Sequence, residues 1–160
     1  MVRVYLSLGS NIERETHIRN ALQALSGLYG QLVLSNVYES EAVGFVGDNF
    51  YNLVVGFDTD LPVGELQAQI KQIEDDNGRL RDGPKFSART LDIDILTYGD
   101  FVGVDSGVQL PRDEITKNAF VLLPLSEIAG SELHPQLGES YQDLWAAYDK
   151  LQQKLWAIQL

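Results

Sequence analysis

The sequence has no cysteine among its 160 residues. Disulfides, thiolate zinc sites and cysteine nucleophiles are therefore excluded. No apolar run approaches the roughly 20 residues of a membrane-spanning helix. The N-terminus, MVRVYLSLGSN, also lacks the apolar core and cleavage site of a signal peptide. We expect a soluble, cytoplasmic protein without a membrane partner, folded as one domain over residues 1–160.

Basic residues are scarce: 12 lysines and arginines stand against 23 aspartates and glutamates, and the formal net charge is −11. This balance argues against a nucleic-acid partner, because phosphate backbones are bound by Lys and Arg. Several basic residues gather in one segment, residues 79–89 (RLRDGPKFSAR). Such a cluster in an acidic chain indicates an anion site, although a solvated loop that balances the acidic surface has the same composition. Nothing in the sequence indicates an obligate protein partner.

Apolar periodicity predicts an α+β fold. Strands are expected at residues 2–8, 32–38, 52–58 and 91–98, helices at 18–28 and from Pro62 to just before Gly78, and polar loops at 39–49 and 79–89. The resulting order, β-α-β-β-α-β, is the ferredoxin-like pattern.

The last third of the chain adds elements to that core. Gly99-Asp100 favours a hairpin turn into a strand at 101–104. A short helix is expected around residues 119–128, broken or bent at Pro124, and a longer helix from Tyr141 to about Leu155. The fold class is thus α+β, with a ferredoxin-like core, a C-terminal hairpin and extra helices.

Asp92 and Asp94 carry the clearest chemical signal, in the stretch RTLDIDIL. Residues i and i+2 of a strand share a face, so the two carboxylates project together while Leu91, Ile93 and Ile95 face the core. Adjacent carboxylates repel each other, and a divalent cation such as Mg²⁺ relieves the repulsion. The alternative is the polar face of an ordinary half-exposed strand. The basic segment that precedes the pair favours a phosphate–metal site.

Several motifs, in their order and spacing, resemble one enzyme family. LGSN after the first strand, YNLVV, RTLDIDIL preceded by the basic loop, and AFVLLPLSEIA are similar to 6-hydroxymethyl-7,8-dihydropterin pyrophosphokinases (HPPK) over nearly the whole chain. The resemblance implies a single HPPK-like domain that transfers the β,γ-pyrophosphate of ATP to the hydroxymethyl group of the pterin and releases AMP, a step of folate biosynthesis. It also implies two Mg²⁺ ions held by Asp92 and Asp94, with ATP as co-substrate.

Position by position, the resemblance implies roles for further residues. The catalytic residues it implies are Arg81, Arg89, Asp92 and Asp94. The pterin-binding residues it implies are Ser40, Val43, Phe50, Asn52 and Phe120, with the pterin between the two aromatic rings. The ATP-binding residues it implies are Lys71, Glu74, Arg81, Phe86, Arg89, Ile95 and Arg112. The two polar loops correspond to loops that close over the substrates in this family.

The chain departs from the family pattern mainly around the nucleotide. Arg112 stands where the family has a histidine that contacts phosphates, and Lys71 stands where it has a glutamine. Asn118 replaces an arginine, although Lys117 is adjacent, and Phe86-Ser87-Ala88 replaces Trp-Gly-Pro. On the pterin side, the chain has Ser40-Glu41-Ala42 in place of a threonine followed by prolines, and Glu41 adds a negative charge.

Three hypotheses follow from these patterns. The first is an active pterin pyrophosphokinase, and the second is a related kinase or pyrophosphokinase that acts on another pterin-like alcohol. The third is a non-catalytic module that binds a pterin or a nucleotide. His17 and His134 are expected to be structural rather than catalytic, because one lies on a helix and the other precedes Pro135 in a loop.

Overall fold

The computed structural model describes residues 1–41, 48–78, 90–151 and 153–160. Its elements up to the strand that carries Asp92 and Asp94 are β1 (Val2–Ser10), α1 (Arg14–Tyr29), β2 (Val33–Leu34), β3 (Val37–Ser40), β4 (Phe50–Thr59), α2 (Val63–Asp76) and β5 (Asp92–Tyr98). They are followed by β6 (Gly103–Asp105), β7 (Val108–Leu110), a 3₁₀ turn (Asp113–Thr116), α3 (Ala119–Ala129), α4 (Tyr141–Ala147) and β8 (Leu155–Ile158).

The main sheet confirms the predicted ferredoxin-like core. Its strand order is β5-β1-β4-β3-β8, with β2 also paired to β4, and every pairing is antiparallel. The single strand expected at residues 32–38 is instead two short strands separated at Ser35 and Asn36. Ser35 N donates to Val54 O (3.0 Å), and Ser35 Oγ accepts a hydrogen bond from Val54 N (2.9 Å). These two bonds hold the interrupted segment on β4.

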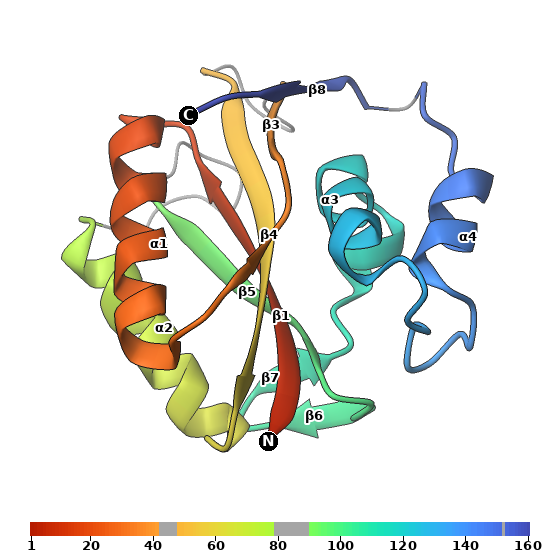
Figure 1. The fold of residues 1–160 in the computed structure, drawn as a ribbon, viewed down its shortest axis with the longest axis horizontal. Coiled ribbons are helices and arrows are strands. Elements are labelled where there is room, and N and C mark those ends of the chain that lie inside the picture. Colours follow the sequence, from red (N-terminus) through yellow and green to blue (C-terminus); the bar gives the residue numbers. More distant parts are fainter. Residues whose placement is uncertain (42–47, 79–89, 152) are drawn as a thin grey trace.

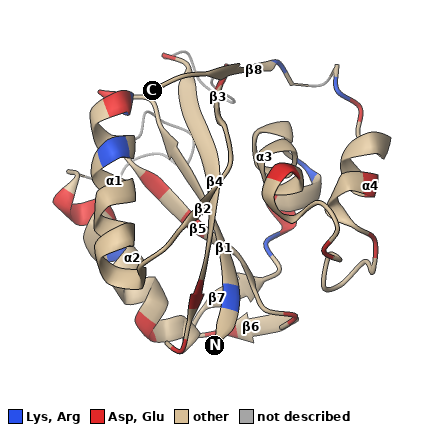
Figure 2. Cartoon of the chain, in the orientation of Figure 1, with Lys and Arg blue, Asp and Glu red and all other residues tan. Residues whose placement is uncertain are grey.

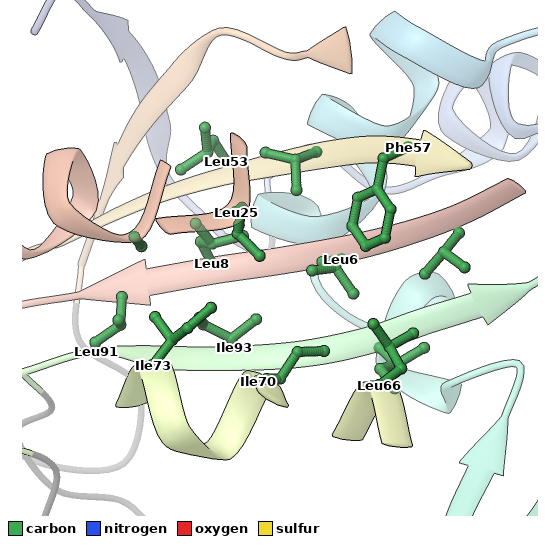
Figure 3. Packing of buried hydrophobic residues seen from close by; sticks show 14 of the residues in the cluster. Leu6, Leu8, Leu25, Leu53, Phe57, Leu66, Ile70, Ile73, Leu91 and Ile93 are labelled. Carbon is green, nitrogen blue, oxygen red and sulfur yellow. The ribbon is translucent and has the colours of Figure 1, made fainter. Parts of the chain in front are cut away.

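One face of the sheet packs on α1 and α2 (Figure 1). Alternate side chains of the central strands point to this face, as the two-residue period of a strand requires. They meet the apolar faces of the two helices in a buried core (Figure 3), which includes Leu6, Leu8, Leu53, Phe57 and Ile93 from the sheet and Leu25, Leu66, Ile70 and Ile73 from the helices.

The opposite face of the sheet is covered by α3, and α4 packs against α3 farther from the sheet, on the right of Figure 1. A second buried cluster joins Tyr5, Val54 and Leu96 of the sheet to Leu122 and Leu125 of α3. α3 continues through Pro124 without a break. A proline inside a helix removes one backbone hydrogen bond, and the burial of the apolar side chains of α3 offsets that loss.

The predicted hairpin after Gly99-Asp100 is wrong. The chain does turn there, since Phe101 N donates to Tyr98 O (3.1 Å). However, β6 pairs with β7 and not with β5, and the two form a separate two-stranded sheet. The turn between them holds Ser106 and Gly107, both with positive φ, which is the conformation a tight hairpin demands.

The predicted helix from Tyr141 to about Leu155 is also wrong in its second half. α4 ends at Ala147, and Leu155–Ile158 forms β8 beside β3. Without β8, β3 would leave a row of backbone groups unpaired at the edge of the sheet. The pairing of β8 therefore decides the conformation of this segment more than local helix propensity does.

Acidic residues are distributed over the helices on both sides of the sheet (Figure 2). In the described part of the chain, no helix combines the length and the apolar character needed to cross a membrane.

Candidate active site

The candidate site residues meet at one end of the sheet. In the strand register, Gly9 of β1 lies opposite Asp92 of β5 on one side and opposite Asn52 of β4 on the other. Directly opposed residues of antiparallel strands point to the same face, and here it is the face that α3 covers. The antiparallel arrangement thus brings together the start of β4, the start of β5 and the end of β1.

The two aspartates lie as the sequence predicts. Along β5, Asp92 and Asp94 are half-buried, whereas Ile93 and Ile95 are buried in the core between the sheet and α1 and α2. Burial, and after it the negative charge of Asp92, raises the pKa of Asp94 to about 8, although Arg112 opposes the shift. Two carboxylates held this close therefore favour a proton or a cation between them.

Arg112 lies beside this pair. Its backbone N–H donates to Leu96 O (2.9 Å), which fixes the residue next to β5. Its Nη2 lies 3.6 Å from Asp94 Oδ1 and donates to Glu114 Oε1 at 2.7 Å. The guanidinium thus bridges the carboxylates of Asp94 and Glu114. In the described part of the chain, it is the positive charge that lies beside the aspartate pair.

Glu74 of α2 supports the strand between the two aspartates. Its carboxylate Oε2 accepts a hydrogen bond from Ile93 N (2.8 Å), and its side chain is buried. β5 is the edge strand of the sheet in the described part of the chain, so this amide has no partner there from a further strand. Glu74 therefore supplies the hydrogen-bond acceptor for the backbone N–H of Ile93, the residue between Asp92 and Asp94. Lys71 lies nearly one turn earlier on the same helix, where it is exposed.

The predicted pterin residues gather at the start of β4. Asn52 is buried, and its Nδ2 donates to Ser40 Oγ at 2.7 Å. A Cβ placed on Gly9 would lie 3.0 Å from Asn52 Oδ1 and 3.8 Å from Phe50 Cδ1. The ring of Phe50 and the amide of Asn52 therefore both lie over Gly9, where the absence of a side chain leaves room for them.

Two other predicted residues are placed less directly. Phe120 is in the first turn of α3, half-buried, on the helix that faces the same side of the sheet. Ile95 is 2% exposed and its side chain belongs to the core on the opposite face. A contact between Ile95 and a nucleotide would have to use its backbone.

Four predicted residues, Val43, Arg81, Phe86 and Arg89, lie outside the described residues. The neighbours of the altered nucleotide positions are described. Lys117, expected to compensate for Asn118, forms an ion pair with Asp113 (3.0 Å), and Asn118 Oδ1 accepts a hydrogen bond from Gln153.

Sequence reasoning missed several residues that frame the site. Glu114 holds Arg112, and Arg14 donates to Asn49 O (2.8 Å) while its guanidinium lies over the Tyr51 ring at 4.0 Å. Ser10 donates to Thr90 O, which joins β1 to the segment just before β5. The LGSN motif was the available signal for Gly9 and Ser10; for Arg14 and Glu114 there was none.

The two histidines form hydrogen bonds within the fold. His17 Nδ1 is 2.8 Å from Asn77 Oδ1, and the buried ring of His134 accepts backbone hydrogen bonds from Gln136 and Leu137. A hollow of about 340 Å³ lies between the other end of β1 and the segment after α3, lined by Arg3, Tyr5, Glu132 and Tyr141 among others. It is separate from the aspartates.

The donor set at Asp92 and Asp94 fits magnesium. Within the described ranges, no group of three or more His, Asp or Glu side chains forms a complete metal cage. Mg²⁺ typically takes one or two carboxylates and completes its coordination with phosphate oxygens and water. A half-buried pair of carboxylates on one strand face matches that requirement.

A model of the family described as 7,8-dihydro-6-hydroxymethylpterin-pyrophosphokinase (HPPK) matches residues 5–130. An Aquifex aeolicus protein named 2-amino-4-hydroxy-6-hydroxymethyldihydropteridine pyrophosphokinase is 38% identical over 137 residues, covering 84% of this chain and 85% of that protein. A Porphyromonas gingivalis protein of the same name is 36% identical over 142 residues, covering 85% of this chain and 96% of that protein.

Solved structures agree on the fold. A Plasmodium falciparum HPPK-DHPS structure with pterin and p-hydroxybenzoate superposes with a TM-score of 0.71 at 17% identity. The match covers 91% of this chain and 42% of that longer chain.

The fold and the site define a small α+β protein with a ferredoxin-like sheet and a paired-carboxylate site at one end. The family match over residues 5–130 agrees with this class of protein. The chain belongs to the 6-hydroxymethyl-7,8-dihydropterin pyrophosphokinase (HPPK) family.

Proposed function

We propose that this protein transfers the β,γ-pyrophosphoryl group of ATP to the hydroxymethyl group of 6-hydroxymethyl-7,8-dihydropterin, a step of folate biosynthesis. The observation that carries the proposal is the position of Asp92 and Asp94. They share a half-buried face of β5, and Asp92 lies in register with Gly9 and Asn52 at the same end of the sheet. Relatives at 36–38% identity bear the name of this enzyme.

The reaction joins the hydroxyl oxygen of the pterin to the β-phosphorus of ATP. The bond between that phosphorus and the oxygen bridging to the α-phosphate breaks, so AMP leaves with the oxygen, and the hydroxyl proton is released. Little covalent chemistry falls to the protein in such a transfer. Its residues act by positioning the two substrates and by stabilising charge on the phosphates.

On the nucleotide side, we assign Asp92 and Asp94 to hold magnesium, with two ions as the proposed number. Magnesium at this place would neutralise phosphate charge and polarise the transferred group. Arg112 lies within 3.6 Å of Asp94 and supplies a permanent positive charge where the family has a histidine. Arg81 and Arg89 are proposed to contact phosphates, and Lys71, Glu74, Phe86 and the backbone of Ile95 to border the nucleotide.

On the pterin side, we assign recognition to Asn52, Ser40 and the rings of Phe50 and Phe120, with Val43 at the border. An amide both donates and accepts hydrogen bonds, which matches the amide-like edge of a pterin. The hydrogen bond from Asn52 Nδ2 to Ser40 Oγ leaves Oδ1 directed toward Gly9 and fixes the orientation of the amide. The aromatic rings suit stacking on a flat heterocycle.

Identification of the nucleotide product tests this proposal. The protein is incubated with ATP, Mg²⁺ and 6-hydroxymethyl-7,8-dihydropterin, and the phosphorus-containing products are followed by ³¹P NMR. We expect AMP and a pterin diphosphate, and neither in excess EDTA. ADP with a pterin monophosphate would show a simple kinase instead. Pterin binding without any nucleotide product would show a binding module, as the altered positions around Arg112 and Asn118 allow.

We further propose that residues 1–160 act as one domain in the cytoplasm on these two small molecules, without nucleic acid, membrane or an obligate protein partner.

A further inference from the structure

Arg112 lies beside Asp94, a carboxylate that we assign to magnesium. Its backbone is tied to Leu96 O (2.9 Å), two residues beyond Asp94 on β5. Its side chain reaches Asp94, where Nη2 stands 3.6 Å from Oδ1, and the same nitrogen donates to Glu114 Oε1 at 2.7 Å. The guanidinium is therefore a counter-ion to a carboxylate that the proposed function assigns to magnesium.

The hydrogen bonding of Arg112 is incomplete. Its Nε is buried and has no hydrogen-bond partner among the described residues. A buried donor without a partner is costly, so an acceptor is expected to reach this atom in the working protein. A guanidinium offers its donors as a planar fork that matches the paired oxygens of a phosphate. The unpaired Nε thus points to an anionic oxygen as the missing partner.

The contact of Arg112 with Asp94 competes with its contact with a phosphate. A guanidinium beside Asp94 repels a divalent cation that approaches the same carboxylate. A phosphate group that draws the guanidinium away removes this repulsion and brings its own oxygens to the cation. The positive charge is then used twice, first on Asp94 and afterwards on the nucleotide.

We propose that Arg112 is an exchangeable counter-ion, which rests on Asp94 and Glu114 without nucleotide and transfers to a phosphate when nucleotide and metal bind together. This rests on the proposed function, because it takes Asp94 as a metal ligand. The consequence is coupling: metal alone binds weakly, nucleotide strengthens it, and metal strengthens nucleotide binding by the same factor.

Direct metal titration of the full chain tests the exchange without relying on turnover. Free Mn²⁺ is measured by electron paramagnetic resonance, with and without a non-hydrolysable ATP analogue, for the wild type and Arg112→Gln. We expect Arg112→Gln to bind Mn²⁺ alone about tenfold more tightly, because one positive charge near a divalent ion is removed. The strengthening by the analogue should shrink in this variant.

Arg3→Gln is the matched control. It also replaces a guanidinium by an amide, but Arg3 pairs with Asp58 (2.7 Å) at the other end of β1. Its Mn²⁺ affinity should equal that of the wild type, which excludes an effect of net charge alone. Arg112→Lys provides a second variant should Arg112→Gln fold poorly. It keeps the charge but not the fork, so we expect wild-type affinity for Mn²⁺ alone and reduced strengthening by the analogue.

A variant of Glu114 shows whether this residue acts by holding Arg112 or by binding the metal itself. If it acts by holding Arg112, then adding Glu114→Gln to Arg112→Gln should not change Mn²⁺ affinity further. A double variant that binds Mn²⁺ much more weakly than Arg112→Gln would show that Glu114 is itself a metal ligand, and the exchange as stated would be overturned.

Asp94→Ala distinguishes failure of the inference from failure of the proposed function. If Asp94→Ala loses Mn²⁺ binding while Arg112→Gln binds Mn²⁺ alone no better than the wild type, the exchange is wrong and the metal site stands. If Asp94→Ala binds Mn²⁺ as the wild type does, Asp94 is not a ligand and both fail.

Discussion

The carboxylate of Glu74, on α2, accepts a hydrogen bond from the backbone amide of Ile93, the residue between the two aspartates, at 2.8 Å. The contact crosses the outer edge of the sheet, where no strand of the described residues pairs with β5. It ties the helix that borders the proposed nucleotide site to the backbone that presents Asp92 and Asp94. A change in Glu74 is therefore expected to be felt at both carboxylates.

Glu74→Ala should destabilise the protein by about 1–3 kcal/mol, because it leaves the Ile93 amide without its acceptor. It should also reduce turnover, since the two aspartates lose their backbone support. Chemical denaturation and initial rates of AMP formation measure the two effects. Glu65→Ala is the control, because Glu65 is exposed on the first turn of the same helix. Equal stability of the two variants would contradict a supporting role for Glu74.

The stability of the metal-free protein should depend on pH through Asp94. Its pKa in the folded protein is raised to about 8, by burial first and by Asp92 second, while an unfolded aspartate titrates near pH ~4. Between these values the folded state keeps a proton that the unfolded state releases, so the free energy of unfolding falls as pH rises.

Denaturation of the wild type and Asp94→Asn in EDTA, from about pH 5 to 8, checks this expectation. The fall contributed by Asp94 should disappear in the variant, so the stability difference in favour of Asp94→Asn should grow with pH. A difference that stays constant over this range would show that the carboxyl titrates as an ordinary one.

Gly9→Ala should weaken pterin binding more than it affects the fold. The added Cβ would lie 3.0 Å from Asn52 Oδ1, so the amide that we assign to the pterin must shift. We expect a severalfold rise in KM for the pterin and a small change in KM for ATP, both from steady-state kinetics. Gly27→Ala, in α1, has open space around the new methyl group. It should leave both constants unchanged and raise stability by about 0.5–1 kcal/mol.

Much of the fold could be predicted because the strands and helices of the core carry regular apolar periods. The alternation around Asp92 and Asp94 predicted that the two aspartates share one face and that Ile93 and Ile95 face the core, and the structure confirms it. β8 could not be predicted in this way. Leu155–Ile158 is short, and its strand conformation depends on β3, a partner more than 100 residues away in the chain. The hairpin at Gly99 failed for a different reason, because β6 makes its own local hairpin with β7 through Ser106 and Gly107 and does not pair with β5.

The candidate site was predicted unevenly. The acidic pair has a local pattern, and motifs such as LGSN and YNLVV mark Gly9 and Asn52. The bridge from Arg112 to Asp94 and Glu114 has no local pattern, because it joins β5 to a turn after β7 through side-chain geometry. The contact between Glu74 and Ile93 likewise appears only when α2 packs beside the edge strand.

The central claim is that Asp92 and Asp94 support pyrophosphoryl transfer. The most direct test compares the rate of AMP formation by Asp94→Asn with that by Asp60→Asn, under saturating ATP, Mg²⁺ and 6-hydroxymethyl-7,8-dihydropterin. Asp60 is exposed and pairs with the N-terminal amine, so its variant removes the same charge away from the site. We expect Asp60→Asn to retain wild-type activity and Asp94→Asn to lose at least about 100-fold, the scale of losing one group that stabilises a transition state. Wild-type activity in Asp94→Asn would contradict the account.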